Sequence, residues 1–256
     1  MNTYFNIRYE FDKNKIHAAV DSHVKSNNPG YICVSDGVIL HNVNKDPSYA
    51  DIVNRSMFSI CDSSFVPLYI RWIYGLHYEQ YCGSQILMDI VSSGKYRMAF
   101  LGASQPILDG LKKTLSTYNP AVESMLFYSL PFVGVDDFDY PAIAEMIEHD
   151  GADIIWVSLG APKQEIFMNR LQPYLKHGVM IAVGAAFNFY SGGVGERRAP
   201  EWMIRMHMEF LYRIMKSPRK QLKRCWGIVS TLPVLLWKEY RKSKKVKTGN
   251  SSKPSC

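Results

Sequence analysis

The sequence lacks the features that mark secreted, disulfide-bonded or zinc-binding proteins. It has five cysteines, at Cys33, Cys61, Cys82, Cys225 and Cys256. They are scattered singly and form no CxxC pair, so we expect buried thiols rather than a disulfide framework or a zinc site. The opening segment MNTYFNIRYE has no basic stretch followed by an apolar one. It therefore does not look like a secretory signal, and we expect a cytoplasmic protein.

Metal-ligand spacings and membrane-spanning runs are also missing. The seven histidines show no ligand spacing, so no metal or other cofactor is expected. The acids Asp136, Asp137 and Asp139 could form a metal-binding DxD motif, but they precede Pro141 and an expected helix, where acids are favourable without a ligand. The uncharged stretch Cys225–Trp237 has thirteen residues, whereas a membrane span needs roughly 20.

Positive charge is concentrated near the C-terminus. The segment Arg205–Lys247 holds thirteen Lys or Arg and two Glu, a net of +11; the whole chain carries +7, so the remainder carries −4. This asymmetry predicts an anionic partner. Trp226 and Trp237 lie between basic runs and fit a segment resting on an anionic membrane surface. The alternative is a helix docked on the body with a solvated basic end. The basic segment leaves an anion- or nucleic-acid-binding protein as an alternative function, but nucleic acid is not the expected partner, because no interleaved aromatics or recognition helix are visible.

Short apolar runs alternate with helical patterns, which predicts an α/β fold with a mostly parallel, Rossmann-like sheet and crossover helices. The expected strands are Tyr31–Val34, Phe58–Cys61, Arg97–Leu101, Ser124–Tyr128, Asp153–Ser158 and Val179–Val183. The expected helices are Lys13–Ser26, Ser48–Arg55, Gly83–Ser93, Pro106–Tyr118, Pro141–His149 and Lys163–Lys176. In such sheets ligands bind beyond the carboxyl ends of the strands, so functional residues are expected just after each strand.

We divide the chain into three parts. Residues 1–208 form the α/β core, and residues 209–241 form a basic helical appendage that associates with a membrane. Residues 242–256, which read KSKKVKTGNSSKPSC, are polar enough to predict a disordered tail.

The stretch VSLGAPKQE, Val157–Glu165, takes an apolar strand through a tight turn into a helix. Pro162 suits a first helical turn, and the small Gly160 lets a ligand approach backbone N–H groups at a positive helix end. Lys163 adds a cation, and Gln164 can hydrogen-bond a hydroxyl or a phosphate oxygen. The turn therefore predicts a site for a phosphate-bearing ligand.

Two further stretches follow it. Val183–Pro200, VGAAFNFYSGGVGERRAP, places small residues after a strand and ends in paired arginines that can fork onto phosphate. Glu209–Arg224, EFLYRIMKSPRKQLKR, is a basic run that on its own would indicate only a solvated helix face.

In order and spacing, the three stretches resemble the WecG/TagA/CpsF glycosyltransferases, whose signatures look like G-x-G-A-P-x-Q-E, V-G-x-x-F-x-x-x-x-G with R-A-P, and E-W-L-x-R with P-x-R. The resemblance implies an inverting, metal-independent transfer of a sugar from a UDP-sugar to a polyprenyl-diphosphate-linked acceptor. The sugar would be of the N-acetylmannosamine type, another hexose or a uronic acid. The resemblance also implies a role in bacterial cell-envelope polysaccharide biosynthesis on the inner face of the cell membrane, and relatives often self-associate, although the sequence does not show the oligomeric state.

The resemblance also implies roles for single residues. Asp62 in ICDSS matches a general base, which takes the acceptor hydroxyl proton; alternatively, it caps the following turn. Gln164 matches a glutamine beside the reacting sugar or diphosphate. Arg213 matches the start of a basic cluster that holds the diphosphate charge. The other members of that cluster are Arg219, Lys220, Lys223 and Arg224. The remaining expected substrate contacts are Ser35, Asp36, Gly102, Gly160, Pro162, Gly184, Phe187, Asn188 and Arg198.

The chain departs from the family pattern at several expected site positions. Ser35-Asp36-Gly37 stands where relatives show Thr-x-Asn, Asn188 stands where they show aspartate, and Tyr81-Cys82 stands where an arginine often occurs. These departures leave the donor sugar open and make Asp36 a second candidate base. They also leave open a catalytically weakened scaffold in a membrane assembly.

Overall fold

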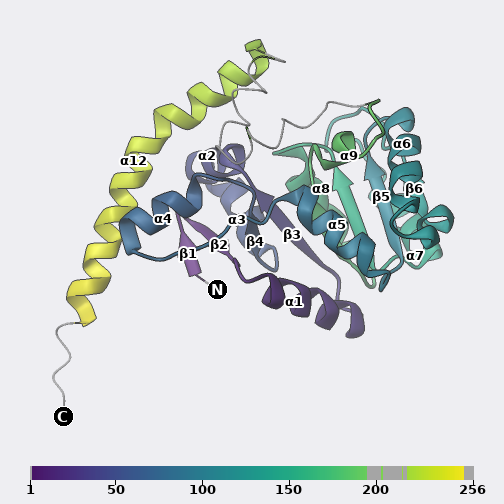
Figure 1. The fold of residues 1–256 in the computed structure, drawn as a ribbon, viewed down its shortest axis with the longest axis horizontal. Helices are drawn as coiled ribbons and strands as arrows, with labels where there is room; N and C mark the ends of the chain where they lie inside the picture. The colour runs from purple at the N-terminus through teal and green to yellow at the C-terminus, as the bar shows by residue number, and fades with distance from the viewer. Residues whose placement is uncertain (1, 195–202, 204–214, 216–217, 251–256) are drawn as a thin grey trace.

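The computed structural model describes residues 2–194, 203, 215 and 218–250, which form an α/β fold around one sheet (Figure 1). The eight strands lie in the order β1-β2-β4-β3-β8-β7-β5-β6. Their bounds are β1 Asn2–Tyr4, β2 Ile7–Tyr9, β3 Gly30–Ser35, β4 Ser59–Cys61, β5 Met98–Gly102, β6 Leu126–Tyr128, β7 Ile154–Ser158 and β8 Val179–Ala182. Only β1 and β2 pair antiparallel among these strands. The mostly parallel α/β sheet expected from the sequence is confirmed.

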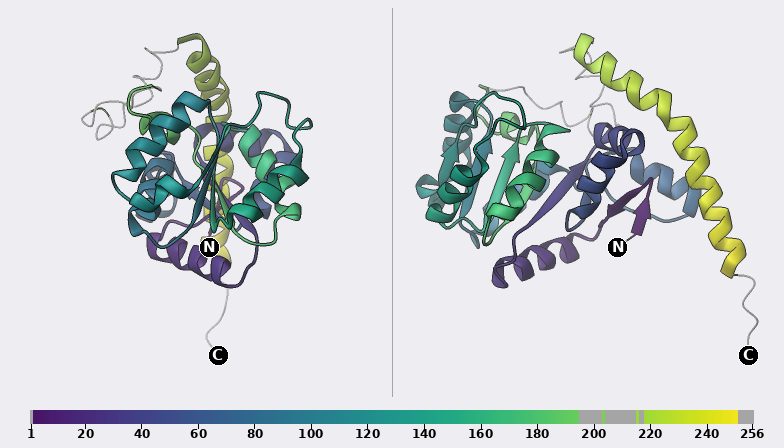
Figure 2. Two further views of the ribbon diagram at one scale, coloured as in Figure 1. Left: turned by 90° about the vertical axis from the view of Figure 1, so that its right-hand side faces the viewer. Right: turned by 180° about the vertical axis from the view of Figure 1, so that it is seen from behind.

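Helices cover both faces of this sheet, as the left view of Figure 2 shows. The helices are α1 Lys13–Lys25, α2 Gly37–Lys45, α3 Pro47–Arg55, α4 Val66–Tyr74, α5 Gly83–Ser93, α6 Gln105–Ser116, α7 Tyr140–Asp150, α8 Lys163–Leu171, α9 Ala186–Phe189 and α12 Pro218–Asn250, with 3-10 turns at Pro120–Ser124 and Gln172–Tyr174. One core joins the sheet to α2, α3, α4, α7 and α8, and the other joins it to α1, α5, α6 and α9. Strands buried on both faces need continuous apolar runs, which explains sequences such as IIWV in β7.

Aspartates start four of the helices. The carboxylates of Asp12, Asp36, Asp46 and Asp139 accept hydrogen bonds from the first backbone N–H groups of α1, α2, α3 and α7. The acidic cluster before α7 therefore includes a helix cap, as the non-metal interpretation of the sequence expects. A neighbouring acid in that cluster, Asp136, forms an ion pair of 2.5 Å with Arg170.

Helix α12 packs against the β1 side of the molecule, at the far end from β6 (Figures 1 and 2). The imidazole Nδ1 of His41 in α2 lies 3.1 Å from the Thr231 hydroxyl, and the Tyr74 hydroxyl of α4 donates to Glu239 at 2.7 Å. A disordered tail was expected from residue 242, whereas α12 continues to Asn250. The expected boundary after residue 208 lies outside the described residues. Within the part of the chain that the structure describes, no helix is long and apolar enough to cross a membrane.

Candidate active site

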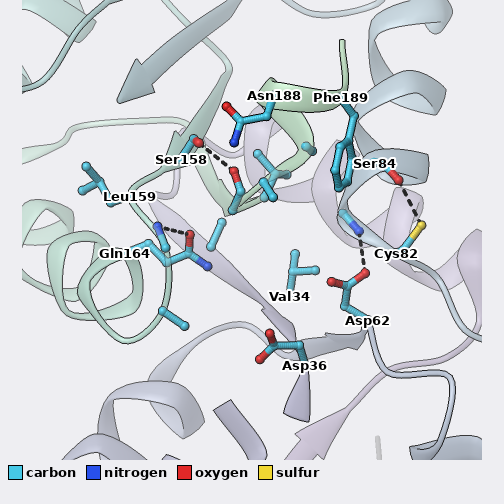
Figure 3. Close-up of a pocket in the computed structure, with 18 of the residues that line it drawn as sticks. Val34, Asp36, Asp62, Cys82, Ser84, Ser158, Leu159, Gln164, Asn188 and Phe189 are labelled. Carbon is cyan, nitrogen blue, oxygen red and sulfur yellow. Dashed lines mark hydrogen bonds between the residues drawn. The ribbon is translucent and has the colours of Figure 1, made fainter. Parts of the chain in front are cut away.

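A cavity of about 410 Å³ opens at the carboxyl ends of five parallel strands (Figure 3). The residues that follow the strands and line it are Asp36 after β3, Asp62 after β4, Ala103 after β5, Leu159–Ala161 after β7 and Val183–Ala186 after β8. This is the edge at which parallel α/β sheets bind ligands. Asp36, Asp62, Gly160, Gln164, Gly184 and Asn188, all expected from the sequence, line this one cavity.

Asp62 is held at the junction of β4 and α5. Its backbone N–H donates to the Ser35 carbonyl at 3.0 Å, and its Oδ1 accepts from the backbone N–H of Gly83 at 3.2 Å. Gly83 is the first residue of α5, so the carboxylate lies at the positive end of that helix. Gln80 donates to the Asp62 carbonyl at 2.9 Å and lines the cavity beside it.

Asp36 presents a second carboxylate to the same cavity. Its Oδ1 accepts from the backbone N–H groups of Val38 at 2.9 Å and Ile39 at 3.0 Å, which caps α2. Figure 3 shows the Asp36 carboxylate below Val34 and the Asp62 carboxylate beside it, with Gln164 and Ser158 across the cavity. Asp36 and Asp62 are therefore both placed to meet a ligand, and each also satisfies the start of a helix.

Gln164 is fixed at both ends of its amide. Its Oε1 accepts from the backbone N–H of Gly160 at 3.1 Å, and its Nε2 donates to Glu165 at 2.8 Å. The side chain is only 4% exposed, although it lines the cavity. Gly160 has a φ of +75°, a left-handed conformation that favours glycine, and this conformation folds the turn back toward Gln164.

Glu165 is a group that the sequence analysis missed. Its carboxylate is fully buried and accepts from the Tyr49 hydroxyl at 2.9 Å as well as from Gln164. Burial raises the pKa of Glu165 to about 7, and the hydrogen bonds from Gln164 and Tyr49 oppose part of that rise. The available signal was the acid that follows Gln164 in GAPKQE, but the sequence alone does not show that it points inward.

Two expected contacts, Ser35 and Gly102, lie behind the cavity wall and not among the residues that line it. Ser35 is the buried last residue of β3. Gly102, with a φ of +101°, passes so close to β7 that an added Cβ would lie 2.4 Å from the Ser158 carbonyl oxygen. Ser35 and Gly102 thus shape the wall, because a strand-end position guarantees proximity but not the direction of a side chain.

Pro162, Phe187 and Lys163 also differ from expectation, since none of them lines the cavity. Pro162 belongs to the turn before α8. Phe187 is buried with its ring 6.0 Å from that of Phe100, in the core beneath the site. Lys163 turns away, bonding the Val133 carbonyl oxygen with its ammonium group.

Polar side chains that were not expected from the sequence also line the cavity. The Ser158 hydroxyl donates to the Gly184 carbonyl at 2.6 Å, which ties the ends of β7 and β8 together. Cys82 and Ser84, 3.2 Å apart through Sγ and Oγ, line the cavity beside Asp62. Ser158 follows from the strand-end rule, because it is the last residue of β7.

Most of the chain matches one known family. Residues 4–248 match the model of the glycosyl transferase WecG/TagA/CpsF family. The chain belongs to this family. A relative from Bacillus subtilis (strain 168), named N-acetylglucosaminyldiphosphoundecaprenol N-acetyl-beta-D-mannosaminyltransferase, is 28% identical over 73% of this chain and 75% of its own. A relative of the same name from Bacillus spizizenii (strain W23) is 24% identical over 78% of this chain and 76% of its own. The expected enzyme class, a glycosyltransferase, is confirmed.

The basic residues expected in this WecG/TagA/CpsF glycosyltransferase cannot be placed around the cavity. Arg198 and Arg213 lie outside the described residues. Arg219, Lys220, Lys223 and Arg224 belong to the first turns of α12, where only the backbone is described. The lining residues from the described ranges include no Lys or Arg. The assignment of a diphosphate-binding cluster therefore stays a prediction.

The buried Glu165 generates a stability prediction. Its pKa of about 7 in the folded state exceeds the ordinary value of 4.5, so the folded protein binds this proton more tightly than the unfolded chain does. Stability from this group is present at low pH and is lost as pH rises from about 4.5 to about 7. We expect Glu165→Gln, which does not titrate, to gain about 3 kcal/mol relative to the wild type between pH 5 and pH 8.

Urea unfolding at several pH values checks this expectation, and the matched control is Glu145→Gln, which removes an exposed carboxylate on α7. A difference between Glu165→Gln and the wild type that does not change with pH would contradict it.

Proposed function

We propose that this glycosyltransferase moves a sugar from a UDP-sugar to a polyprenyl-diphosphate-linked sugar, by single displacement with inversion and without a metal ion. The two Bacillus relatives are named for this acceptor class and for an N-acetylmannosamine-type sugar, which supports the proposal. The observation that carries the proposal is one cavity of about 410 Å³, at the strand ends of a glycosyltransferase fold, that is lined by Asp36, Asp62 and Gln164.

The proposed reaction needs one base and one set of cations. Asp62 takes the proton of the acceptor hydroxyl as its oxygen attacks the anomeric carbon, and the bond from that carbon to UDP breaks. A base must come within roughly 3 Å of the proton that it accepts, which a carboxylate on the cavity wall allows. The departing diphosphate gains negative charge, which guanidinium and ammonium groups can stabilise in place of a metal ion. Arg198, Arg213 and the first basic turns of α12 are the proposed source of that charge.

We also propose that the protein rests on the inner face of a membrane through α4 and α12. Trp72 on α4 is 71% exposed, and Trp226 and Trp237 on α12 are 76% and 53% exposed. The Trp72 ring stacks on Tyr240 at 6.3 Å between centroids, so the two helices share one apolar surface. Aromatic rings beside Lys and Arg are typical of surfaces that enter the headgroup layer of an anionic bilayer. Exposed basic residues flank this surface at Arg71, Lys238, Arg241, Lys242, Lys244 and Lys245.

Both interpretations of the basic C-terminal segment describe part of α12. Its inner face docks on the body, where Leu235 and Glu239 are buried. The outer face carries the exposed tryptophans. Docking therefore leaves an amphipathic surface free for a membrane, and the two ideas do not compete.

Turnover of a UDP-sugar tests the proposed reaction directly. We expect one of UDP-N-acetylmannosamine, UDP-N-acetylglucosamine, UDP-glucose and UDP-glucuronic acid to be turned over with a short-chain prenyl-diphosphate-linked N-acetylglucosamine, at a rate that EDTA does not change. Product formation by mass spectrometry is the measurement. No turnover of any donor, with anionic vesicles present, would favour the scaffold alternative.

The two candidate bases can be told apart by a matched pair of variants. Asp62→Asn should lower kcat by about 10²-fold or more, because an amide cannot accept the proton, while folding and UDP binding change little. Asp36→Asn should keep activity within a few-fold, since asparagine also caps a helix and α2 stays intact. Steady-state kinetics, with circular dichroism as the folding control, decide between them. A large loss of kcat in Asp36→Asn and a small one in Asp62→Asn would assign the role of base to Asp36.

Membrane binding can be tested on α4, which belongs to the folded body. Trp72→Ser combined with Trp237→Ser should weaken sedimentation with phosphatidylglycerol vesicles by roughly tenfold or more, given about 1.5–3 kcal/mol for burying a large apolar side chain. The control is Phe132→Ser, which removes a fully exposed aromatic ring from the loop after β6, at the far edge of the sheet. Equal binding by the double variant and the control would refute the proposed membrane surface.

A further inference from the structure

The carboxylate of Glu165 sits in an unusual place for an acid. It is fully buried beside the cavity wall, and no salt bridge among the described residues includes it. An ionised carboxylate without a cationic partner is costly to bury, so such a group persists where its hydrogen bonds do something that an apolar residue cannot. In Glu165 those bonds run to Tyr49 and to Gln164.

These bonds form a chain that ends at the cavity. The Tyr49 hydroxyl donates to Oε2 of Glu165 at 2.9 Å, and Oε1 accepts from Nε2 of Gln164 at 2.8 Å. The other end of the amide, Oε1 of Gln164, accepts from the backbone N–H of Gly160 at 3.1 Å. An amide nitrogen has two N–H donors, so one is left. Figure 3 shows this nitrogen facing the side of the cavity that holds Asp36.

We propose that Glu165 is a positioning residue for the transferase reaction, which with Tyr49 locks the Gln164 amide so that its remaining N–H points at the substrate. The inference rests on the proposed function and extends it to a residue outside the cavity wall. A free glutamine amide can present either its oxygen or its nitrogen to a ligand. If one orientation is fixed in advance, substrate binding does not have to order the amide, and the amide presents a hydrogen-bond donor to sugar or diphosphate oxygens.

The groups around Glu165 make the orientation of the Gln164 amide depend on pH. Titratable groups face it from three elements: Tyr31 and Cys33 in β3, Tyr49 in α3, and Asp36 at the start of α2. Burial raises the pKa of Cys33, Tyr31 and Tyr49, which keeps all three neutral, and Asp36 repels a second negative charge. The hydrogen bond from Tyr49 lowers the pKa of Glu165 in part, but burial outweighs it and brings that pKa to about 7.

Protonation would change what the carboxyl group offers to Gln164. An ionised Glu165 only accepts hydrogen bonds, and it selects the amide nitrogen of Gln164. A protonated carboxyl group carries one O–H, for which the amide oxygen of Gln164 is a nearby acceptor, and that pairing favours the flipped amide. The bond from the Gly160 N–H still favours the present orientation, so we expect the productive orientation to become less populated as pH falls through about 7.

The experiment compares Glu165→Gln and Tyr49→Phe with the wild type. The rate of transfer from UDP-N-acetylmannosamine to prenyl-diphosphate-linked N-acetylglucosamine is followed from pH 5.5 to 9. In the wild type we expect kcat to fall on the acid side with an apparent pKa of about 7. Glu165→Gln should lose that limb and retain roughly a tenth of kcat at pH 8, with UDP affinity within twofold. Tyr49→Phe removes a hydrogen bond that lowers the pKa of Glu165, so its limb should move to higher pH.

A second measurement does not depend on turnover. The side-chain amide resonances of Gln164, assigned by their loss in Gln164→Glu, should titrate with a midpoint near pH 7 in the wild type and not in Glu165→Gln. Identical pH profiles in all three proteins, or Gln164 resonances that ignore residue 165, would overturn the inference. An inactive wild type whose Gln164 resonances still titrate with residue 165 would instead count against the proposed function and leave the lock standing.

Discussion

Strands covered by helices on both faces leave very little room for polar chemistry. In this protein the strands β3, β4, β5, β7 and β8 are buried and mostly apolar, so polar side chains can meet a ligand only where those strands end. The parallel arrangement brings five such ends to one edge, and the cavity lies there. Asp36, Asp62 and Gln164 come from distant parts of the sequence and meet because of this single constraint.

Because of the same constraint, each polar group near the cavity also stabilises a helix start or a turn of the fold. Asp36 caps α2, Asp62 meets the first N–H of α5, and Gln164 closes the turn at Gly160. Buried polar atoms must be paired, so the site is held by the hydrogen bonds that the fold needs in any case. A consequence is that variants of these residues need an isosteric replacement, because alanine would remove a cap or a turn as well as a chemical group.

Functional residues of a parallel sheet follow its strands, and this rule determines which site residues could be predicted from the sequence. It placed Asp62, Gln164 and Gly184 correctly at one edge, because strand ends can be located from apolar runs and glycines. It could not separate Asp36, which lines the cavity, from Ser35, which lies behind it, because neighbouring strand residues point to opposite faces. Glu165 was missed for a related reason, since burial of an acid is decided by how α8 packs on α3.

The sequences of several elements indicate their secondary structure only weakly. The hairpin of β1 and β2 is formed by strands of three residues each, too short for a clear alternation. Helix α4 reads VPLYIRWIY and is apolar on both its buried and its exposed side, so its sequence shows no clear amphipathic pattern. The expected helix through Lys176 instead ends at Leu171, because Pro173 lacks the N–H that would continue it.

The packing of α12 gives a physical account of one departure from the family pattern. Gly37 stands where relatives show the asparagine of Thr-x-Asn, and it is the first residue of α2, next to Asp36. A Cβ added at Gly37 would lie 2.9 Å from the Cδ1 atom of Ile228, so α12 occupies the space that a larger side chain would take. Glycine here lets α12 lie directly on the start of α2. The helix that carries the exposed tryptophans thus packs on the element whose cap borders the cavity, and His41 of α2, 3.1 Å from the Thr231 hydroxyl, is a second contact between α2 and α12.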